Sequence, residues 1–122
     1  MVAAGNGNTD AINSSPARTE EAITVGASTF GDERAEFSNF GSSIDIFAPG
    51  MNILSAWNNY GYQYSNGTSM AAPHVGGYAA YLLGIDSSLT PASVASTIIN
   101  GALVGALTGI REFFYFTLHI YP

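Results

Sequence analysis

The chain has 122 residues, of which 47% are hydrophobic and 10% charged, a composition that suits one compact domain or part of a larger one. The formal net charge of −6, with three Arg and no Lys, disfavours nucleic-acid binding, because a phosphate backbone is recognised by clustered cations. Without Cys there is no disulfide or thiolate metal site, no apolar run reaches the length of a membrane span, and Met1 is not followed by the basic and apolar segments of a signal peptide.

Short apolar runs bounded by Gly, Ser, Asn and Pro predict three buried strands, at residues 23–28, 44–48 and 52–57. Residues 69–83 follow them and carry no charge, which predicts a helix buried on nearly every side.

A second helix is predicted to begin after Thr90, a residue that suits an N-cap, with Pro91 in the first helical position. It extends to about Asn100 and places Val94, Ile98 and Ile99 on one face, so we expect it to cover one side of a sheet. The alternation of strands and helices, without a repeat or linker, predicts a single α/β unit.

Ser69 stands at the start of the long predicted helix, directly after Gly67 and Thr68. A serine nucleophile needs a base to take its proton and amide donors to hold the oxyanion formed on attack. The free N–H groups and the positive end of a helix dipole supply such donors, and Gly67 allows close approach of a substrate. The alternative is that Ser69 is only a helix N-cap.

The residues Asn-Gly-Thr-Ser-Met-Ala-Ala-Pro-His-Val at positions 66–75 resemble the nucleophile segment of the subtilisin-like serine peptidases (subtilases), most closely the proteinase K type. Val-Ala-Ala-Gly-Asn-Gly-Asn at positions 2–8 resembles the oxyanion-hole segment of that family, at the family's distance from Ser69. The resemblance covers about residues 1–110 and implies the C-terminal portion of a peptidase domain. The implied fold is an incomplete three-layer α/β fold, with part of a mainly parallel sheet and a buried helix that bears the nucleophile. Further similar segments, in the family's order and spacing, lie at 23–28, 37–41, 45–50 and 53–55.

The resemblance implies that Ser69 attacks a peptide carbonyl and that the side-chain amide of Asn6 binds the oxyanion beside the Ser69 backbone N–H. The alternative for Asn6 is a residue that merely fits a Gly-rich turn. Substrate contact is implied for Ala3, Ala4, Gly5, Gly67 and Thr68.

The other two members of a Ser-His-Asp triad are not found. No His precedes Ser69, although the subtilase triad runs Asp, His, Ser along the chain. His74 lies about 140° around the helix axis from Ser69, so we expect a packed, hydrogen-bonded core histidine there. His119 lies near the chain end, and Asp10 and Asp45 have no histidine to orient. We therefore expect the base and its aspartate in an N-terminal half outside this chain, and no triad-dependent activity of the 122 residues alone.

A structural calcium ion is a further expectation from the resemblance to proteinase K relatives. The implied ligands are the Asp45 carboxylate and the backbone carbonyls of Glu20 and Ala22. The alternative is that Asp45 only accepts backbone N–H groups in a turn.

Residues 111–122 depart from the family pattern and form an aromatic, weakly charged segment. Such a segment could serve as a strand that docks a partner, or it could be sequence translated past an exon boundary or in another frame, which we favour.

Two hypotheses about function follow. By resemblance, the chain is part of an extracellular endopeptidase that cleaves proteins or peptides. The alternative is a non-catalytic truncated product or binding fragment that docks another chain through an exposed sheet edge or the aromatic segment.

Overall fold

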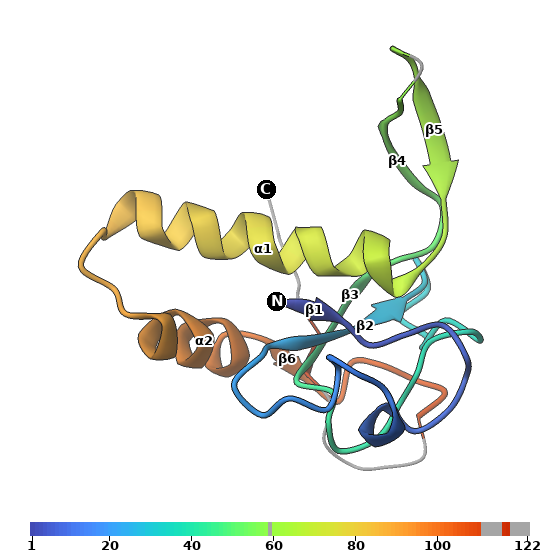
Figure 1. Cartoon of the computed structure of the whole chain (residues 1–122), viewed down its shortest axis with the longest axis horizontal. Helices are drawn as coiled ribbons and strands as arrows, with labels where there is room; N and C mark the ends of the chain where they lie inside the picture. Colours follow the sequence, from blue (N-terminus) through green and yellow to red (C-terminus); the bar gives the residue numbers. More distant parts are fainter. Residues whose placement is uncertain (59, 111–115, 118–122) are drawn as a thin grey trace.

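The computed structural model describes residues 1–58, 60–110 and 116–117 (Figure 1). Its main element is a five-stranded sheet with the strand order β1-β2-β3-β7-β6. Neighbouring strands from β1 to β7 are parallel, and β6 is antiparallel to β7, so the sheet is mainly parallel as predicted. The strands are β1 (Val2–Ala3), β2 (Thr24–Ser28), β3 (Ile46–Pro49), β6 (Leu103–Val104) and β7 (Phe116–Thr117).

The predicted strands at 23–28 and 44–48 are confirmed as β2 and β3, the buried centre of the sheet. Their side chains divide between two hydrophobic clusters, one on each face. Gly26 of β2 is required on one of these faces, because a Cβ there would lie 2.4 Å from the ring of Phe47. The position of the Phe47 ring over β2 therefore depends on the absence of a side chain at position 26.

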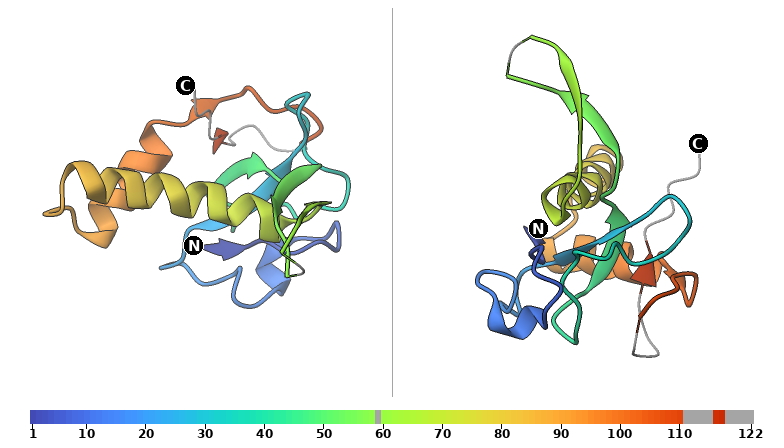
Figure 2. Two further views of the ribbon diagram at one scale, coloured as in Figure 1. Left: turned by 90° about the horizontal axis from the view of Figure 1, so that it is seen from above. Right: turned by 90° about the vertical axis from the view of Figure 1, so that its right-hand side faces the viewer.

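Two helices pack on one face of the sheet, α1 (Thr68–Ile85) and α2 (Pro91–Asn100) (Figure 2). The expected start of α2 is confirmed, since Ser93 N donates to the Thr90 hydroxyl and Thr90 N donates to the Ser93 hydroxyl, a capping box. The cluster under the helices consists of Val25, Ala27, Ala35, Ile46, Ala48, Ala71, Val75, Ala79, Val94, Ile98 and Ala102. The opposite face is covered by loops and a short 3-10 helix (Ala11–Asn13), with Ala4, Ala11, Ala17, Ile44, Phe47 and Leu107 buried between them and the sheet.

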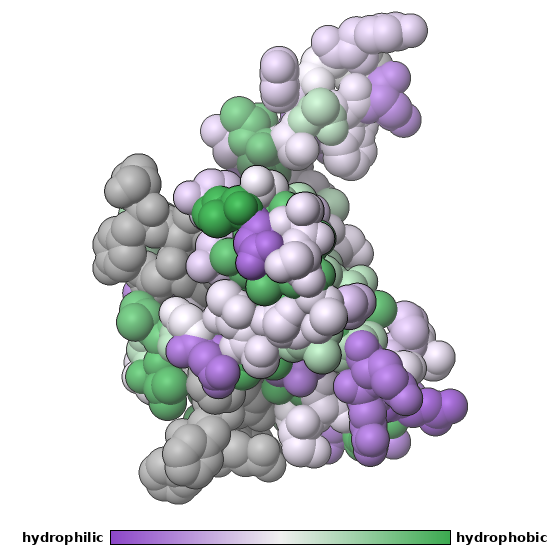
Figure 3. Space-filling view, turned by 90° about the vertical axis from the view of Figure 1, so that its left-hand side faces the viewer, coloured by the Kyte–Doolittle hydropathy of each residue, from purple (hydrophilic) through white to green (hydrophobic). Residues whose placement is uncertain are grey.

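The burial of α1 differs from the prediction. Its length is as expected, but only Thr68, Ala71, Val75 and Ala79 are buried, a single stripe at helical spacing. Tyr81 and Ile85 are 63% and 68% exposed, and Figure 3, which faces the end of the molecule where α1 ends, shows strongly hydrophobic side chains at the surface. Burial on nearly every side is therefore wrong for this chain, because the described residues supply a packing partner for one face of α1 only.

The predicted buried strand at 52–57 is also corrected. Residues Ile53–Ala56 form β4, which pairs antiparallel with β5 (Tyr62–Ser65) in a separate two-stranded hairpin that projects from the body (Figures 1 and 2). Most of its residues are exposed. The alternation of tyrosine with polar residues in β5 was a strand signal that the sequence analysis missed.

Of the aromatic segment 111–122, only β7 lies within the described residues, where Thr117 pairs with Phe47 of β3. Both interpretations of that segment concern residues outside the described ranges and stay predictions. No helix in the described ranges is long and apolar enough to cross a membrane.

Candidate functional site

The start of α1 lies against the loop that follows β1, and Asn6 joins the two. Thr68 donates to Asn6 Oδ1 from its backbone N and from its hydroxyl, each at 2.9 Å. The same hydroxyl accepts from Gly5 N at 3.1 Å. The N-cap residue of α1 is Gly67, which has no side chain to cap the helix, so Asn6 provides the acceptor across the fold.

These bonds fix the orientation of the Asn6 side-chain amide. A backbone N–H can only donate, so the atom facing Thr68 N must be the Asn6 oxygen, and the Nδ2 group points elsewhere. Asn6 is exposed, and Nδ2 donates to no acceptor among the described residues. Gly67, with φ of 153°, stands beside it, since a Cβ at Gly67 would lie 3.5 Å from Asn6 Nδ2 and 3.7 Å from Ser69 N. Two free donors, Nδ2 and the first-turn amide of Ser69, therefore border the same space.

Ser69 occupies the first turn of α1 and is exposed. Since Gly67 is the N-cap residue, the alternative that Ser69 itself caps the helix is wrong. The Ser69 side chain opens into a pocket of about 280 Å³ between α1 and β4, and within the described ranges no base hydrogen-bonds to its hydroxyl. The residues that line this pocket are Ile53, Leu54, Ser55, Ser69, Met70, Pro73 and His74.

His74 is hydrogen-bonded as expected but only half-buried. Its Nδ1 lies 2.9 Å from the carbonyl oxygen of Met70, which can only accept, so Nδ1 carries the proton. His74 shares the pocket with Ser69, yet no hydrogen bond joins the two side chains. This agrees with the expectation that His74 does not act as the base for Ser69.

The loop that carries Asn6 is held by Asn39, whose role the sequence analysis missed. Asn39 is buried, and its Oδ1 accepts from Gly7 N at 3.0 Å and Thr9 N at 3.1 Å. Its Nδ2 donates to Ala4 O at 2.8 Å and Ser14 Oγ at 3.2 Å. Asn39 lies in one of the segments that resembles the family, but nothing in the local sequence shows that its amide is surrounded by four partners.

The residues expected to contact substrate lie around this junction. Ala3 belongs to β1, Ala4 is buried and donates its N–H to Val25 O at 3.0 Å, and Gly5 follows with φ of 100°. Thr68 is buried and accepts from Gly5 N, and Gly67 packs beside Asn6, so the backbone of residues 3–5 and the helix start form one wall.

The three residues expected at a calcium site, Asp45, Glu20 and Ala22, line one pocket of about 280 Å³. Asp45 Oδ2 accepts from Thr24 N at 2.7 Å, as the turn alternative requires, and Oδ1 has no partner in the described part of the chain. Burial raises the pKa of Asp45, and the bond from Thr24 N opposes this only in part. A partly buried carboxylate with a free oxygen fits a cation, although Arg18 also lines the pocket and no group of three acidic or histidine side chains gathers among the described residues.

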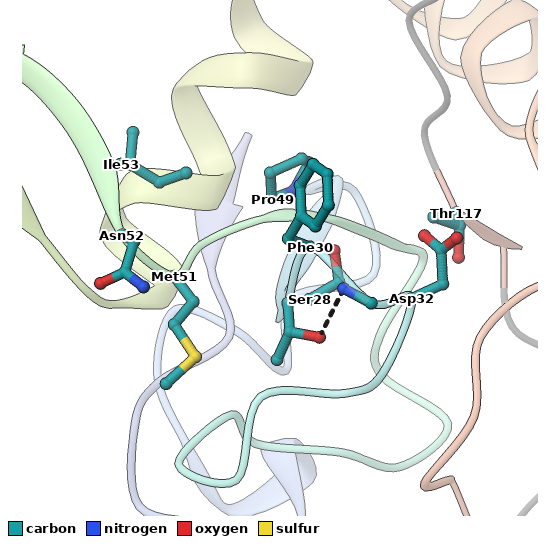
Figure 4. A pocket seen from close by; sticks show the side chains of 10 residues that line it. Ser28, Phe30, Asp32, Pro49, Met51, Asn52, Ile53 and Thr117 are labelled. Atoms are coloured by element: carbon teal, nitrogen blue, oxygen red, sulfur yellow. Dashed lines mark hydrogen bonds between the residues drawn. The ribbon is translucent and has the colours of Figure 1, made fainter.

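A larger pocket of about 900 Å³ lies at the carboxyl ends of β2 and β3 (Figure 4). None of the predicted site residues lines it. Ile53 borders both this pocket and the one at Ser69, and the buried hydroxyl of Thr117 lacks a hydrogen-bond partner among the described residues. The residues that line this larger pocket are Ser28, Thr29, Phe30, Gly31, Asp32, Pro49, Met51, Asn52, Ile53 and Thr117.

Comparison with known proteins agrees with this geometry. The chain is 54% identical over 120 aligned residues to the subtilisin-like serine protease pepC of Aspergillus niger. The alignment covers 89% of this chain and 22% of that protein. It is 50% identical over 111 residues to the alkaline serine exoprotease A of Vibrio alginolyticus, covering 91% of this chain and 21% of the relative. The chain thus spans about a fifth of the length of these relatives.

Among solved structures, a cold adapted subtilisin-like serine proteinase superposes with a TM-score of 0.95 at 44% sequence identity, over 98% of this chain and 44% of that one. The incomplete subtilisin-like α/β fold is thereby confirmed. The Subtilase family, peptidase S8, matches residues 1–114, and this chain therefore belongs to it.

Proposed function

We propose that this chain is the C-terminal part of a subtilisin-like serine endopeptidase of the proteinase K type. Ser69 attacks the carbonyl carbon of a peptide bond, and Asn6 Nδ2 and Ser69 N bind the oxyanion that forms. The observation that carries the proposal is the pair of bonds from Thr68 to Asn6 Oδ1, because they occupy the acceptor end of the amide and leave its donor end, Nδ2, free beside Gly67 and the Ser69 amide.

The base that takes the Ser69 proton comes from the rest of the protein in this proposal. Among the described residues no base reaches Ser69, and the matched structure is more than twice as long as this chain. A histidine oriented by an aspartate would accept the proton from Ser69 Oγ and return it to the leaving amine. Gly67 and the wall at residues 3–5 would hold the acyl part of the substrate.

The test joins this chain to the N-terminal part of the cold adapted proteinase, in place of the matching portion of that enzyme. We expect Ser69→Ala to abolish peptide hydrolysis. Asn6→Ala should lower kcat by roughly 10²–10³-fold with little change in KM, a magnitude that belongs to subtilisin itself, where loss of the oxyanion-hole asparagine has this effect. Asn100→Ala, an exposed residue at the end of α2, is the control and should leave the rate unchanged. Unchanged turnover in the Ser69 or Asn6 variant would refute the assignment.

A structural calcium ion at Asp45, Glu20 and Ala22 forms part of the proposal. The raised pKa of Asp45 and its free Oδ1 support it, because a cation would compensate the desolvated carboxylate. We also propose that the complete enzyme acts outside the cell on protein or peptide substrates, and fractionation of the source organism's culture would test this.

A second candidate function is a non-catalytic fragment that docks another polypeptide. The exposed apolar side chains of α1, Tyr81, Leu83 and Ile85, favour it, since such patches commonly mark contact surfaces. A monodisperse monomer in analytical ultracentrifugation, with no partner retained at micromolar concentration, would count against this candidate.

A further inference from the structure

The β4–β5 hairpin presents an aromatic face next to Ser69. In the antiparallel register Leu54 pairs with Tyr64 and Ala56 pairs with Tyr62, and directly paired residues point to the same side of a sheet. Leu54, Ala56, Tyr62 and Tyr64 therefore form one face, which we term the aromatic face. Tyr62 is 79% and Tyr64 is 64% exposed.

This exposure is not compensated by charge. No Asp, Glu, Lys or Arg occurs between Asp45 and Asp86, so the hairpin, the Ser69 pocket and α1 make one uncharged surface. A two-stranded hairpin is marginally stable on its own, and contiguous exposed aromatic groups generally mark a binding surface. The chemistry of the surface favours an uncharged, aromatic or aliphatic occupant.

The aromatic face meets the pocket at Ser69 through Leu54, while Ile53 and Ser55, which alternate with Leu54 along β4, also line that pocket. Leu54 belongs to both, and β4 forms one wall of the pocket while the first turns of α1 form the other. The wall expected to hold the acyl part of a substrate, residues 3–5, does not line this pocket. A peptide with its carbonyl at Ser69 and its acyl part on residues 3–5 would thus carry its leaving part across the pocket toward the hairpin.

We propose that the aromatic face is a specificity subsite that binds an uncharged aromatic or large aliphatic side chain on the leaving-group side of the scissile bond. This inference rests on the proposed function of Ser69. The occupant is an extended peptide, which can also bond to the outer edge of β4, because the hairpin has no third strand within the described ranges. Tyr62 and Tyr64 supply the contact area and act as specificity residues; they take no part in the chemistry.

Binding is measured first, on the 122-residue chain with Ser69→Ala, so that hydrolysis plays no role. The probes are tripeptide amides that mimic the part of the substrate released as the leaving group. Each contains one Phe or one Ser, placed in turn at each of the three positions, with alanine at the other two. Trp57, the single tryptophan, directly follows β4, and its backbone N–H donates to Gly61 O at 2.8 Å, so its fluorescence reports on the hairpin. We expect the Phe peptide to bind at least about tenfold more tightly than the matched Ser peptide at one position.

Tyr62→Thr and Tyr64→Thr keep β-propensity and should remove most of that preference, whereas Tyr60→Asn, at the fully exposed tip with φ of 64°, should not change it, since Asn tolerates a positive φ. Equal affinity for the Phe and Ser peptides, or an equal loss in the Tyr60 variant, would overturn the proposal. If a variant loses the circular dichroism of the folded chain, the comparison of the two peptides on the chain with intact tyrosines still decides the matter.

The joined enzyme separates this inference from the proposed function. Hydrolysis that depends on Ser69 but is indifferent to Phe or Ser on the leaving side would overturn the inference and leave the proposed function intact. Selective binding of the Phe peptide without any Ser69-dependent hydrolysis would overturn the proposed function, and with it the assignment to the leaving-group side, and would leave only a peptide-binding surface at the aromatic face. Association of two copies through the aromatic face, seen as loss of peptide binding with rising protein concentration, would also overturn it.

Discussion

Thr68 and Asn6 are joined by two hydrogen bonds to one oxygen atom, Asn6 Oδ1. The Thr68 hydroxyl also accepts a hydrogen bond from Gly5 N. Thr68 is fully buried and Asn6 is exposed, so these bonds are partly shielded from water, and the orientation of the Asn6 amide depends on them. The start of α1, the loop that carries Asn6 (the donor loop) and the end of β1 are therefore joined into one unit.

We expect Thr68→Val to destabilise the chain by about 1–3 kcal/mol, because Gly5 N loses its acceptor while the volume of the side chain is kept. In the joined enzyme, kcat should fall more than KM changes, since the Asn6 amide loses its second anchor. Urea unfolding and peptide hydrolysis measure the two effects. Thr68→Ser keeps the hydroxyl and is the control, and equal stability of the Val and Ser variants would contradict the role of the hydroxyl.

Asn39→Ala should destabilise the chain by about 2–4 kcal/mol, because its removal leaves the N–H groups of Gly7 and Thr9 and the carbonyl of Ala4 without their partner. Asn100→Ala, at an exposed position, should change stability by less than about 0.5 kcal/mol. Hydrogen exchange of the Gly7 and Thr9 amides gives a local measurement. Unchanged protection of these amides in the Asn39 variant would show that the loop is held in some other way.

Two glycine-to-alanine substitutions should have opposite effects on the stability of the chain. Gly26→Ala places a Cβ 2.4 Å from the Phe47 ring and should cost about 1–3 kcal/mol through overpacking. Gly77→Ala, within α1, meets nothing within 4 Å and should stabilise the chain by roughly 0.5–1 kcal/mol through helix propensity. Thermal unfolding compares them directly. A stabilising Gly26 variant would mean that the Phe47 ring does not lie over position 26.

Asp45→Asn should reverse its effect on stability when calcium is added. The folded-state pKa of Asp45 is raised above its unfolded value, mainly by burial, so without calcium the stability contributed by this group falls as pH rises through that pKa. At neutral pH in a chelator, the Asn variant, which can still accept from Thr24 N, should melt above the parent chain. With millimolar calcium the parent chain should melt higher, and its Tm should rise with pH across the titration of Asp45. Melting curves that ignore calcium in both proteins would contradict the proposed metal site.

The isolated chain should not react with a fluorophosphonate probe. Without a base the Ser69 hydroxyl keeps its proton at neutral pH, and the oxyanion donors alone give only a small rate. Mass spectrometry of the digested chain measures labelling at Ser69. Stoichiometric labelling within minutes would mean that another group activates Ser69. His74 shares the pocket of Ser69, so it would be the first residue to substitute in a search for that group.

The parts of the fold and site that the sequence revealed are those specified by local residues. Thr90 and Pro91 mark the start of α2 because capping is a property of adjacent positions, and the decapeptide around Ser69 marks the start of α1. Asn6 was placed near Ser69 only through the family resemblance, since the two segments are far apart in the chain.

The features that the sequence could not reveal depend on which distant parts of the chain pack against each element. The uncharged run 69–83 shows that α1 avoids charge, but its exposed face reflects which elements are present to cover it. Leu54 suggested burial, yet β4 has only β5 as a partner, and a hairpin of two strands encloses nothing. Asn39 was undetectable as a loop anchor, because its four partners lie 25 to 35 residues before it in the chain.

The bond between Thr68 N and Asn6 Oδ1 spans 62 residues, and this separation has a consequence for synthesis. At about 5–20 residues per second, Thr68 leaves the ribosome about 3–12 s after Asn6. During that interval the donor loop has no helix to cap, and the oxyanion donors cannot be arranged around a reacting carbonyl. A nascent chain is thereby prevented from assembling this site until β1, β2 and β3, the strands that support α1, have all been made.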